Sequence, residues 1–277
     1  MKREEAIRRL CLEPLPVLDV PAAEAVDMAA AAGFSAMSLW VHSPVPQFVA
    51  PCLVEQADAP ALKRRLRDAG MSVVNLEVFR VGPGADITQY EGPIARGAEL
   101  GAKTATAIAR DGSNETAEVL ARFTQLAASH GIRVNVEFLS YRGPCTLSQA
   151  VDLVGRTGEA GTGILVDVLH LVRSGGLVEE VRALPPGLIG HVQLCDGPLT
   201  APEAGLEHES AADRMFPGTG AFPLEAFIGA LPSVPLGLEI PRMSAAFQGL
   251  SPAERVSALL KATLSFLGEK HGNGAIS

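Results

Sequence analysis

The chain has 277 residues, of which 47% are hydrophobic and 19% are charged, and its formal net charge is −8. This length is enough to bury a large core, and α/β barrels of similar length commonly form one domain. The acidic charge argues against DNA or RNA as a partner, because proteins that bind nucleic acids usually present a basic face to the phosphates. No stretch comes near the ~20 apolar residues of a membrane span, so we expect no membrane partner.

The N-terminus and the cysteines predict where the protein resides. The first ten residues, MKREEAIRRL, lack the apolar stretch of a secretory leader. The cysteines are scattered without C-x-x-C spacing, at Cys11, Cys52, Cys145 and Cys195. We therefore expect reduced thiols in a cytoplasmic protein.

Short β-rich runs alternate with longer helical stretches along the whole chain. The predicted strands are residues 8–13, 35–41, 72–79, 102–109, 133–138, 163–168, 190–195 and 235–240. The predicted helices are residues 22–33, 61–70, 93–101, 115–131, 146–158, 177–187, 223–231 and 251–270. Eight successive strand–helix units predict a parallel sheet, and eight strands close naturally into a barrel.

The fold prediction is therefore α/β, with a single (β/α)8 TIM barrel over residues 1–277. An open, doubly wound sheet is the alternative, although it usually has fewer units. The longest irregular segment, residues 196–222, follows the seventh predicted strand. Loops of this length inside a domain are usually functional or disordered.

Four of the later strands carry one polar side chain near their C-terminal end. Alternate side chains of a strand face opposite sides, and the apolar face packs on the helices, so these polar groups point into the barrel. They are Glu137, Asp167, Gln193 and Glu239. This end of a TIM barrel carries the active site, so we expect the four groups to converge there.

Three converging carboxylates repel one another unless a cation neutralises them. Together with the Gln193 amide they offer hard oxygen donors, which suit Mn²⁺ or Mg²⁺ best, with Co²⁺ and Zn²⁺ as alternatives. A single buried acid such as Asp167 is as often a hydrogen-bonded structural residue. Four donors on four successive strands favour a site for one divalent metal.

These residues lie in motifs that resemble the xylose isomerase-like TIM-barrel superfamily. The motifs are VEFLS, LVDVLHLVRSGG, IGHVQLCDGP, RMFPGTGAFPL and LGLEIP. The superfamily includes sugar isomerases and epimerases, inosose dehydratases and 3-dehydroshikimate dehydratases. The resemblance implies that one divalent metal is bound at the four strand-end positions, and that His170 and Arg214 contact the substrate.

Gln193 departs from one common pattern of the superfamily. Ketose epimerases usually have histidine at this ligand position, whereas some dehydroshikimate dehydratases are similar to this chain in the segment QLCDGP. DNA-repair endonucleases of the same barrel class need many histidines for a cluster of zinc ions, and this chain has six in all. The endonuclease branch is therefore not expected.

The expected chemistry is removal of a proton next to a carbonyl, with an enediolate stabilised by the metal. Glu137 and Glu239 would act as base and acid, and His170 would serve as a base or proton donor in a dehydratase. We expect an isomerase or epimerase of a sugar, sugar acid or sugar phosphate. A dehydratase of the 3-dehydroshikimate or inosose type is the alternative, and a non-catalytic barrel acting as a binding subunit is the second alternative.

Three further side chains are candidates for substrate binding. The Arg214 guanidinium suits a carboxylate or phosphate. His191 lies one pleat deeper than Gln193 and fits a core role equally well. Trp40, like Glu13 and Glu77, lies near the end of an earlier strand and fits a rim position equally well. Such barrels often pair, so a homodimer is one expected assembly.

Overall fold

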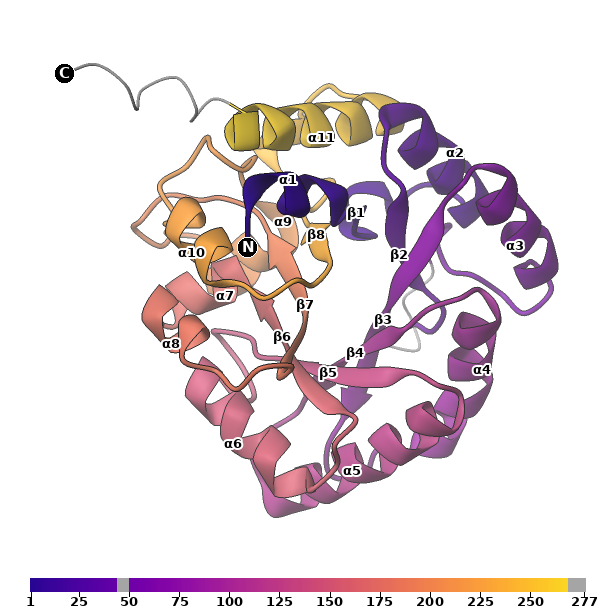
Figure 1. Cartoon of the computed structure of the whole chain (residues 1–277), viewed down its shortest axis with the longest axis vertical. Helices are drawn as coiled ribbons and strands as arrows, with labels where there is room; N and C mark the ends of the chain where they lie inside the picture. The colour runs from indigo at the N-terminus through magenta and orange to yellow at the C-terminus, as the bar shows by residue number, and fades with distance from the viewer. Residues whose placement is uncertain (44–49, 269–277) are drawn as a thin grey trace.

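The computed structural model describes residues 1–43 and 50–268. Eight parallel strands form a closed barrel in the order of the sequence, and helices surround it (Figure 1). This arrangement confirms the predicted TIM barrel. The strands are β1 (Leu10–Leu12), β2 (Ala36–Trp40), β3 (Ser72–Val81), β4 (Thr104–Ala109), β5 (Arg133–Glu137), β6 (Thr162–Asp167), β7 (Ile189–Leu194) and β8 (Leu236–Leu238).

The outer ring contains the helices that the sequence predicts. They are α2 (Ala22–Ala32), α3 (Ala59–Asp68), α4 (Glu91–Glu99), α5 (Asn114–Ser129), α6 (Leu147–Thr157), α8 (Val178–Arg182), α10 (Leu224–Ala230) and α11 (Pro252–Gly268). Helix α8 is shorter than predicted, because Pro185 and Pro186 cannot continue a helix. The last two residues predicted for the final helix lie outside the described residues. Short 3-10 helices occur at η1 (Leu15–Val17), η2 (Ile87–Tyr90) and η3 (Ala245–Phe247). No described helix has the length and apolar character that crossing a bilayer requires.

Helices α1 (Arg3–Arg8), α7 (Val168–Arg173) and α9 (Leu206–Ala212) fall outside the predicted ones. The prediction that Val168 continues the sixth strand is wrong, because α7 begins there. Asp167 caps this helix, with its Oδ1 accepting a hydrogen bond from the backbone N–H of Leu169 at 2.8 Å. The apolar run around the boundary hides the change from strand to helix periodicity.

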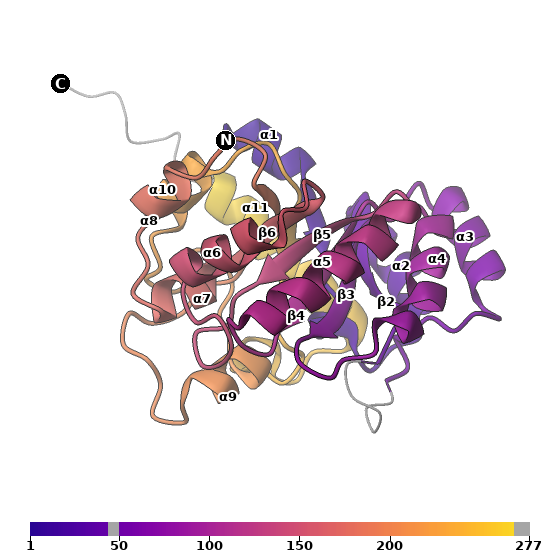
Figure 2. The ribbon, with the colours of Figure 1, turned by 90° about the horizontal axis from the view of Figure 1, so that it is seen from below.

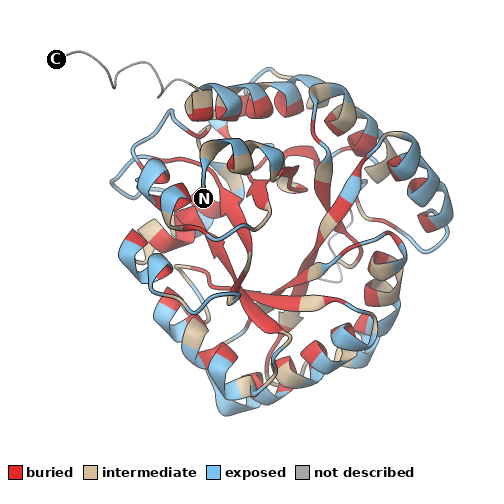
Figure 3. Ribbon diagram, in the orientation of Figure 1, coloured by how far each residue is buried: buried red, intermediate tan, exposed pale blue. Residues whose placement is uncertain are grey.

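The predicted alternation of faces is present in the strands. Val134 and Val136 of β5 belong to the apolar core between the barrel and the helices, as do Val192 and Leu194 of β7. The strands are buried, and the helices expose only their outer faces (Figure 3). Polar side chains of β5 to β8 are therefore left for the interior of the barrel.

The connections that follow the strands gather at one end of the barrel, together with α9, while α1 lies at the opposite end (Figure 2). The segment of residues 196–222 contains α9, so it is more ordered than the predicted loop. The Asp196 carboxylate joins its two ends by accepting hydrogen bonds from the backbone N–H groups of Gly197, Gly218 and Phe222 at 2.9 to 3.0 Å. A Cβ atom on Gly220 would lie 2.4 Å from Asp196 Oδ1, so only glycine fits there.

Two helical glycines test how closely the helices must approach the barrel. A Cβ atom on Gly97 of α4 would lie 2.1 Å from Cδ1 of Leu76, which is fully buried in β3, whereas one on Gly155 of α6 would meet nothing within 4 Å. We expect Gly97→Ala to lower the free energy of unfolding by about 1–3 kcal/mol. Gly155→Ala should raise it by up to about 1 kcal/mol. Urea denaturation measures both, and equal effects of the two substitutions would contradict this packing.

Candidate active site

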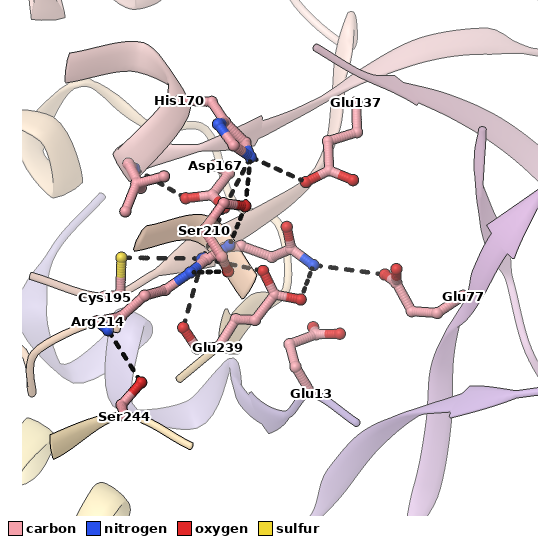
Figure 4. A network of polar contacts seen from close by, with 12 residues as sticks. Glu13, Glu77, Glu137, Asp167, His170, Cys195, Ser210, Arg214, Glu239 and Ser244 are labelled. Atoms are coloured by element: carbon pink, nitrogen blue, oxygen red, sulfur yellow. Dashed lines mark hydrogen bonds and ion pairs between the residues drawn. The ribbon is translucent and has the colours of Figure 1, made fainter. Parts of the chain in front are cut away.

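The strand register brings the four predicted donors to the same end of the barrel. Asp167 pairs with Gln193 across β6 and β7, and Gln193 pairs with Gly237 of β8, two residues before Glu239. Glu137 is the last residue of β5. The side chains of Glu137, Asp167 and Glu239 point toward one region above the strand ends (Figure 4). The structure thus brings together the side chains that the sequence predicts to converge.

The interior is crowded with carboxyl groups. Each of them is at most 7% exposed, and they are Glu13, Glu77, Glu137, Asp167 and Glu239. Arg214, which is 2% exposed, is the one arginine or lysine within 4.0 Å of any of them among the described residues. Buried charges of one sign are costly unless they are paired, so this region has a strong deficit of positive charge.

Arg214 compensates part of this excess of negative charge. Its Nη1 donates to Oδ2 of Asp167 at 2.7 Å and lies 3.0 Å from Oε2 of Glu239. Its Nε donates to the backbone carbonyl of Ser210 at 3.1 Å. Asp167, whose other oxygen caps α7, therefore has a partner within the chain. Part of the negative charge that a metal is expected to neutralise is thus balanced by this ion pair within the chain.

Arg214 follows the end of α9 by two residues and lines the barrel mouth. Arg173 of α7 holds this helix through a buried, two-pronged ion pair in which its Nε and Nη2 donate to the Glu209 carboxylate, both at 2.6 Å. Ser210 is the residue of α9 that follows Glu209, and Arg214 lies four residues further along the chain. The long segment after β7 thus supplies the only guanidinium that contacts the buried carboxylates among the described residues.

The Gln193 amide has an orientation set by its neighbours. Its Nε2 donates to Oε1 of Glu239 at 3.0 Å and to Oε1 of Glu77 at 3.4 Å. Glu77 is itself fixed on β3, because Asn75 Nδ2 and Thr106 Oγ1 donate to it at 2.7 and 3.0 Å. The Gln193 Oε1 atom is buried and has no hydrogen-bond partner. An unpartnered buried carbonyl oxygen is a donor available for a cation.

Burial raises the pKa of the carboxyl groups that face the cavity. The pKa values of Glu77 and Glu137 lie well above the usual range because of burial and then of the neighbouring carboxylates. Burial raises the pKa of Glu239 to about 8, although the Arg214 charge opposes the shift. A carboxyl group with the pKa of Glu239 exchanges protons near neutral pH, as acid–base catalysts do.

His170 is fully buried on α7, and burial lowers its pKa to about 4. Its ring is therefore neutral at pH 7. Nδ1 accepts a hydrogen bond from the backbone N–H of Ser140 at 3.3 Å, so the ring proton resides on Nε2. That nitrogen lies 4.0 Å from Glu137 Oε1 and 3.9 Å from Asp167 Oδ2. His170 thus presents an N–H donor to the region between these carboxylates.

His191 lies deeper in the barrel. Its Nε2 is 2.7 Å from Oε1 of Glu13, both side chains are fully buried, and neither lines the cavity above. A Cβ atom on Gly237 would lie 1.8 Å from the same Glu13 oxygen, so glycine makes room for this pair. The structure places His191 in the floor beneath Gln193, away from the position where a substrate would enter.

A cavity of about 320 Å³ opens above these groups. Its polar lining includes Glu137, Glu239, His170 and Arg214, and Trp40 contributes to its apolar wall. A larger cavity of about 550 Å³ lies between α10, α11 and the connection before α10. Asp196 lines that larger cavity, but its carboxylate is engaged by backbone N–H groups, so we place the chemistry in the barrel mouth.

The donor set fits a hard divalent cation. Single ligand atoms of Glu137, Asp167 and His170 lie within 4.8 Å of one another, and the buried, unpartnered Gln193 Oε1 is a further oxygen donor. Among the described residues, no arginine or lysine lies within 4.0 Å of Glu137, and the His170 ring, 4.0 Å away, is neutral. The negative charge that Arg214 leaves uncompensated suits a dication bound by oxygen atoms.

The comparisons with known proteins agree with this architecture. The family model described as the xylose isomerase-like TIM barrel matches residues 26–263. The chain belongs to this family. The resemblance inferred from the sequence motifs is thereby confirmed.

Two relatives have the same sequence identity to this chain. One is the 3-dehydroshikimate dehydratase of Pseudomonas aeruginosa, 29% identical over 236 residues, which are 78% of this chain and 36% of the dehydratase. The other is a putative hydroxypyruvate isomerase of Streptomyces coelicolor, 29% identical over 254 residues, which are 78% of this chain and 81% of the isomerase. This chain thus spans about a third of the dehydratase and most of the isomerase.

A solved structure, described as the IolI protein with a binding zinc atom, has a TM-score of 0.78 and 17% identity. The match covers 95% of this chain and 99% of that one. This similarity shows the fold alone.

The buried ion pairs of Arg214 generate a stability prediction. Within the part of the chain that the structure describes, Arg214 is the only guanidinium that contacts Asp167 and Glu239, so we expect Arg214→Ala to lower the free energy of unfolding at pH 7 by about 3–5 kcal/mol. Arg182→Ala is the matched control, because Arg182 forms an exposed pair with Glu179 and should cost less than about 1 kcal/mol. Similar losses for the two variants in chemical denaturation would contradict the importance of the buried pairs.

Proposed function

We propose that this protein is a divalent-metal-dependent enzyme that moves a proton next to a carbonyl group of a small polyhydroxylated substrate. The preferred reaction is isomerisation or epimerisation of a sugar, sugar acid or sugar phosphate. The observation that supports this most is the group of buried carboxyls that line a cavity large enough for such a molecule, Glu77, Glu137 and Glu239. The Gln193 amide is hydrogen-bonded to two of them, and its buried Oε1 has no partner. The isomerase relative, which this chain covers over most of its length, supports the same reaction class.

Glu137, Asp167, Gln193 and Glu239 would hold the metal. Mn²⁺ or Mg²⁺ suits the oxygen donors best, and Zn²⁺, which one structural neighbour binds, or Co²⁺ is the alternative. Bound there, a dication supplies Lewis-acid polarisation of the substrate carbonyl. The Arg214 guanidinium shares Asp167 and Glu239 with this site and limits their repulsion.

The proton transfers fall to side chains that line the cavity. Glu137 at the end of β5 and Glu239 after β8 enter it from different strands, so one carboxyl group can remove a proton while the other returns one. The pKa of Glu239, which is raised to about 8, suits this exchange near neutral pH, and burial also raises the pKa of Glu137. His170 would donate its Nε2–H to a substrate oxygen, since its Nδ1 is engaged by Ser140.

A dehydratase is the second candidate. The dehydratase relative and Gln193 at the third donor position favour it. The same proton removal next to a carbonyl would then be followed by expulsion of a hydroxyl group on the adjacent carbon as water. A protonated carboxyl group such as Glu239 would give the proton, and the neutral His170 ring would donate a hydrogen bond to the leaving oxygen. The two reactions differ in product, because elimination of water leaves a conjugated, ultraviolet-absorbing compound whereas isomerisation conserves mass.

Metal binding is tested without any substrate. Calorimetry or Mn²⁺ electron paramagnetic resonance should show one bound ion per chain, and Glu137→Gln should weaken its affinity at least ~10-fold because a charged ligand is lost. Glu118→Gln, on the exposed face of α5, is the control with the same change in charge and should bind Mn²⁺ like the parent protein. Equal affinity for the parent protein and the Glu137 variant would remove Glu137 from the ligand set.

The reaction is tested in deuterated water with Mn²⁺, using a panel of ketoses, hydroxypyruvate, inosose and 3-dehydroshikimate. We expect nuclear magnetic resonance to show deuterium entering one of them next to its carbonyl, with or without loss of water. Glu239→Gln should slow this exchange about 10²- to 10⁴-fold, as expected when an acid–base group is removed. Full exchange in the Glu239 variant would rule out its role in proton transfer.

A further inference from the structure

Two arginines outside the proposed metal and proton-transfer groups line the same cavity. Arg80 comes from β3 and Arg142 from the connection after β5. Both also line a second, adjoining cavity of about 200 Å³, and Ile108 is the third residue that the two cavities share. The two guanidinium-bearing side chains therefore lie at the boundary between the site and this side chamber.

The side chamber has the opposite charge to the floor of the site. Its charged lining residues are Arg80, Arg110 and Arg142, and no described acidic residue lines it. The site next to it contains Glu77, Glu137 and Glu239. A ligand that spans both regions would meet oxygen donors at one end and cationic donors at the other.

A bulge in β3 turns Arg80 toward the cavity. The register between β3 and β4 shifts between Leu76 and Phe79. Phe79 then packs outward against Tyr90 and Phe123, at ring-centroid distances of 5.2 and 5.1 Å. Its neighbours Val78 and Arg80 line the cavity instead. Bulges of this kind often re-aim side chains beside active sites.

The Arg80 guanidinium lacks a charged partner. Among the described residues, no carboxylate lies within 4.0 Å of it, and its Nε is buried without a hydrogen-bond partner. Arg80 as a whole is half-buried, and a cation that is partly removed from water is usually paired, because leaving it unpaired is costly. An anionic group of a ligand would supply the missing partner.

Arg142 lies at the edge of the cavity, and its present contacts leave its guanidinium accessible to a ligand. Its guanidinium lies 5.2 Å from the Tyr141 ring centroid and forms an ion pair with Glu207 of α9. Its side chain is 40% exposed in that pair. Exposed ion pairs contribute little free energy, so an anion in the side chamber can compete with Glu207 for this guanidinium.

We propose that Arg80 and Arg142 form an anion subsite that binds the carboxylate or phosphate group of the substrate. The inference rests on the proposed function for the position of the carbonyl end, which would lie at Glu137 and Glu239. It also replaces the expectation that Arg214 anchors an anionic group, because the Arg214 guanidinium is engaged by Asp167 and Glu239. Neutral polyhydroxylated carbonyl compounds should bind the same cavity more weakly.

The chain contains its own reporter for the test. Trp40 is the single tryptophan of the sequence, and it lines the cavity. Its fluorescence, with calorimetry as a second readout, should follow titration with three compounds that differ in charge: D-fructose, D-fructose 6-phosphate and D-fructuronate. We expect at least one of the two anions to bind ~10- to 100-fold more tightly than the neutral sugar, as for hydrogen bonds to a charged group. The anion that shows the preference identifies phosphate or carboxylate as the natural group.

Arg80→Gln and Arg142→Gln should each reduce this preference about 10-fold. Arg122→Gln on the exposed face of α5 carries the same change in charge and should leave the preference intact. Arg142 is partly exposed, so its variant keeps the test valid if the Arg80 variant fails to fold. Equal binding of the three compounds, or a preference that survives in the two cavity variants, would overturn the proposal.

Failure of this inference is distinguishable from failure of the proposed function. The titrations are run with and without Mn²⁺, because the arginines belong to the protein and should select the anion in either condition. If the parent protein does not bind Mn²⁺, this result would count against the metal-dependent function alone. Retained Mn²⁺ binding together with no selection between charged and neutral compounds would count against the anion subsite alone.

Discussion

The interior of this barrel is governed by an excess of buried negative charge. In the described residues, 1–43 and 50–268, five buried carboxyl groups gather in the barrel and at its mouth, and one guanidinium contacts two of them. Water cannot screen charges at such depth, so protonation, the Arg214 pair and a bound cation are the ways of relieving the repulsion. The raised pKa values of Glu77, Glu137 and Glu239 express the first of these. The same excess of negative charge therefore favours both the uptake of protons by these carboxyl groups and the binding of a cation beside them.

The polar groups of the site come from two kinds of backbone. Glu77, Glu137 and Gln193 lie on strands, and the closed hydrogen-bond ladders fix their relative heights. Ser210 and Arg214 come from the segment after β7, which is fastened to α7 by the Arg173–Glu209 pair. The rigid barrel therefore positions the oxygen donors, while a connecting segment supplies the cation that balances them.

The fold and the four donors could be predicted because they depend on periodicity. Alternation along β5 to β8 separates the side chains that pack on helices from those that point inward, and the closed barrel confirms this separation. The convergence of Glu137, Asp167, Gln193 and Glu239 follows from strand ends alone. These features need no knowledge of any particular contact.

The remaining features depend on contacts that periodicity does not encode. The Asp167 cap begins α7 inside an apolar run, so Val168 is assigned to the strand from sequence. Alternation places Phe79 inside the barrel, whereas the bulge in β3 sends it outward and brings Arg80 to the cavity. The reach of Arg214 depends on how residues 196–222 fold, and a pattern of residue types gives no measure of it. Glu77 could have been found, since Asn75 and Glu77 alternate in β3 as Asn135 and Glu137 do in β5.

The hydrogen bonds that Asp196 accepts at both ends of the segment after β7 affect how the sequence of such a barrel can change during evolution. One carboxylate gathers the backbone at residues 197, 218 and 222, so the two ends of the segment stay together whatever lies between them. Changes of length or sequence within that span can replace the helix that bears Ser210 without separating these ends, provided that a cation still reaches Asp167 and Glu239. The part of the segment between these anchor points is therefore where evolution or protein design can give the same barrel a new ligand preference.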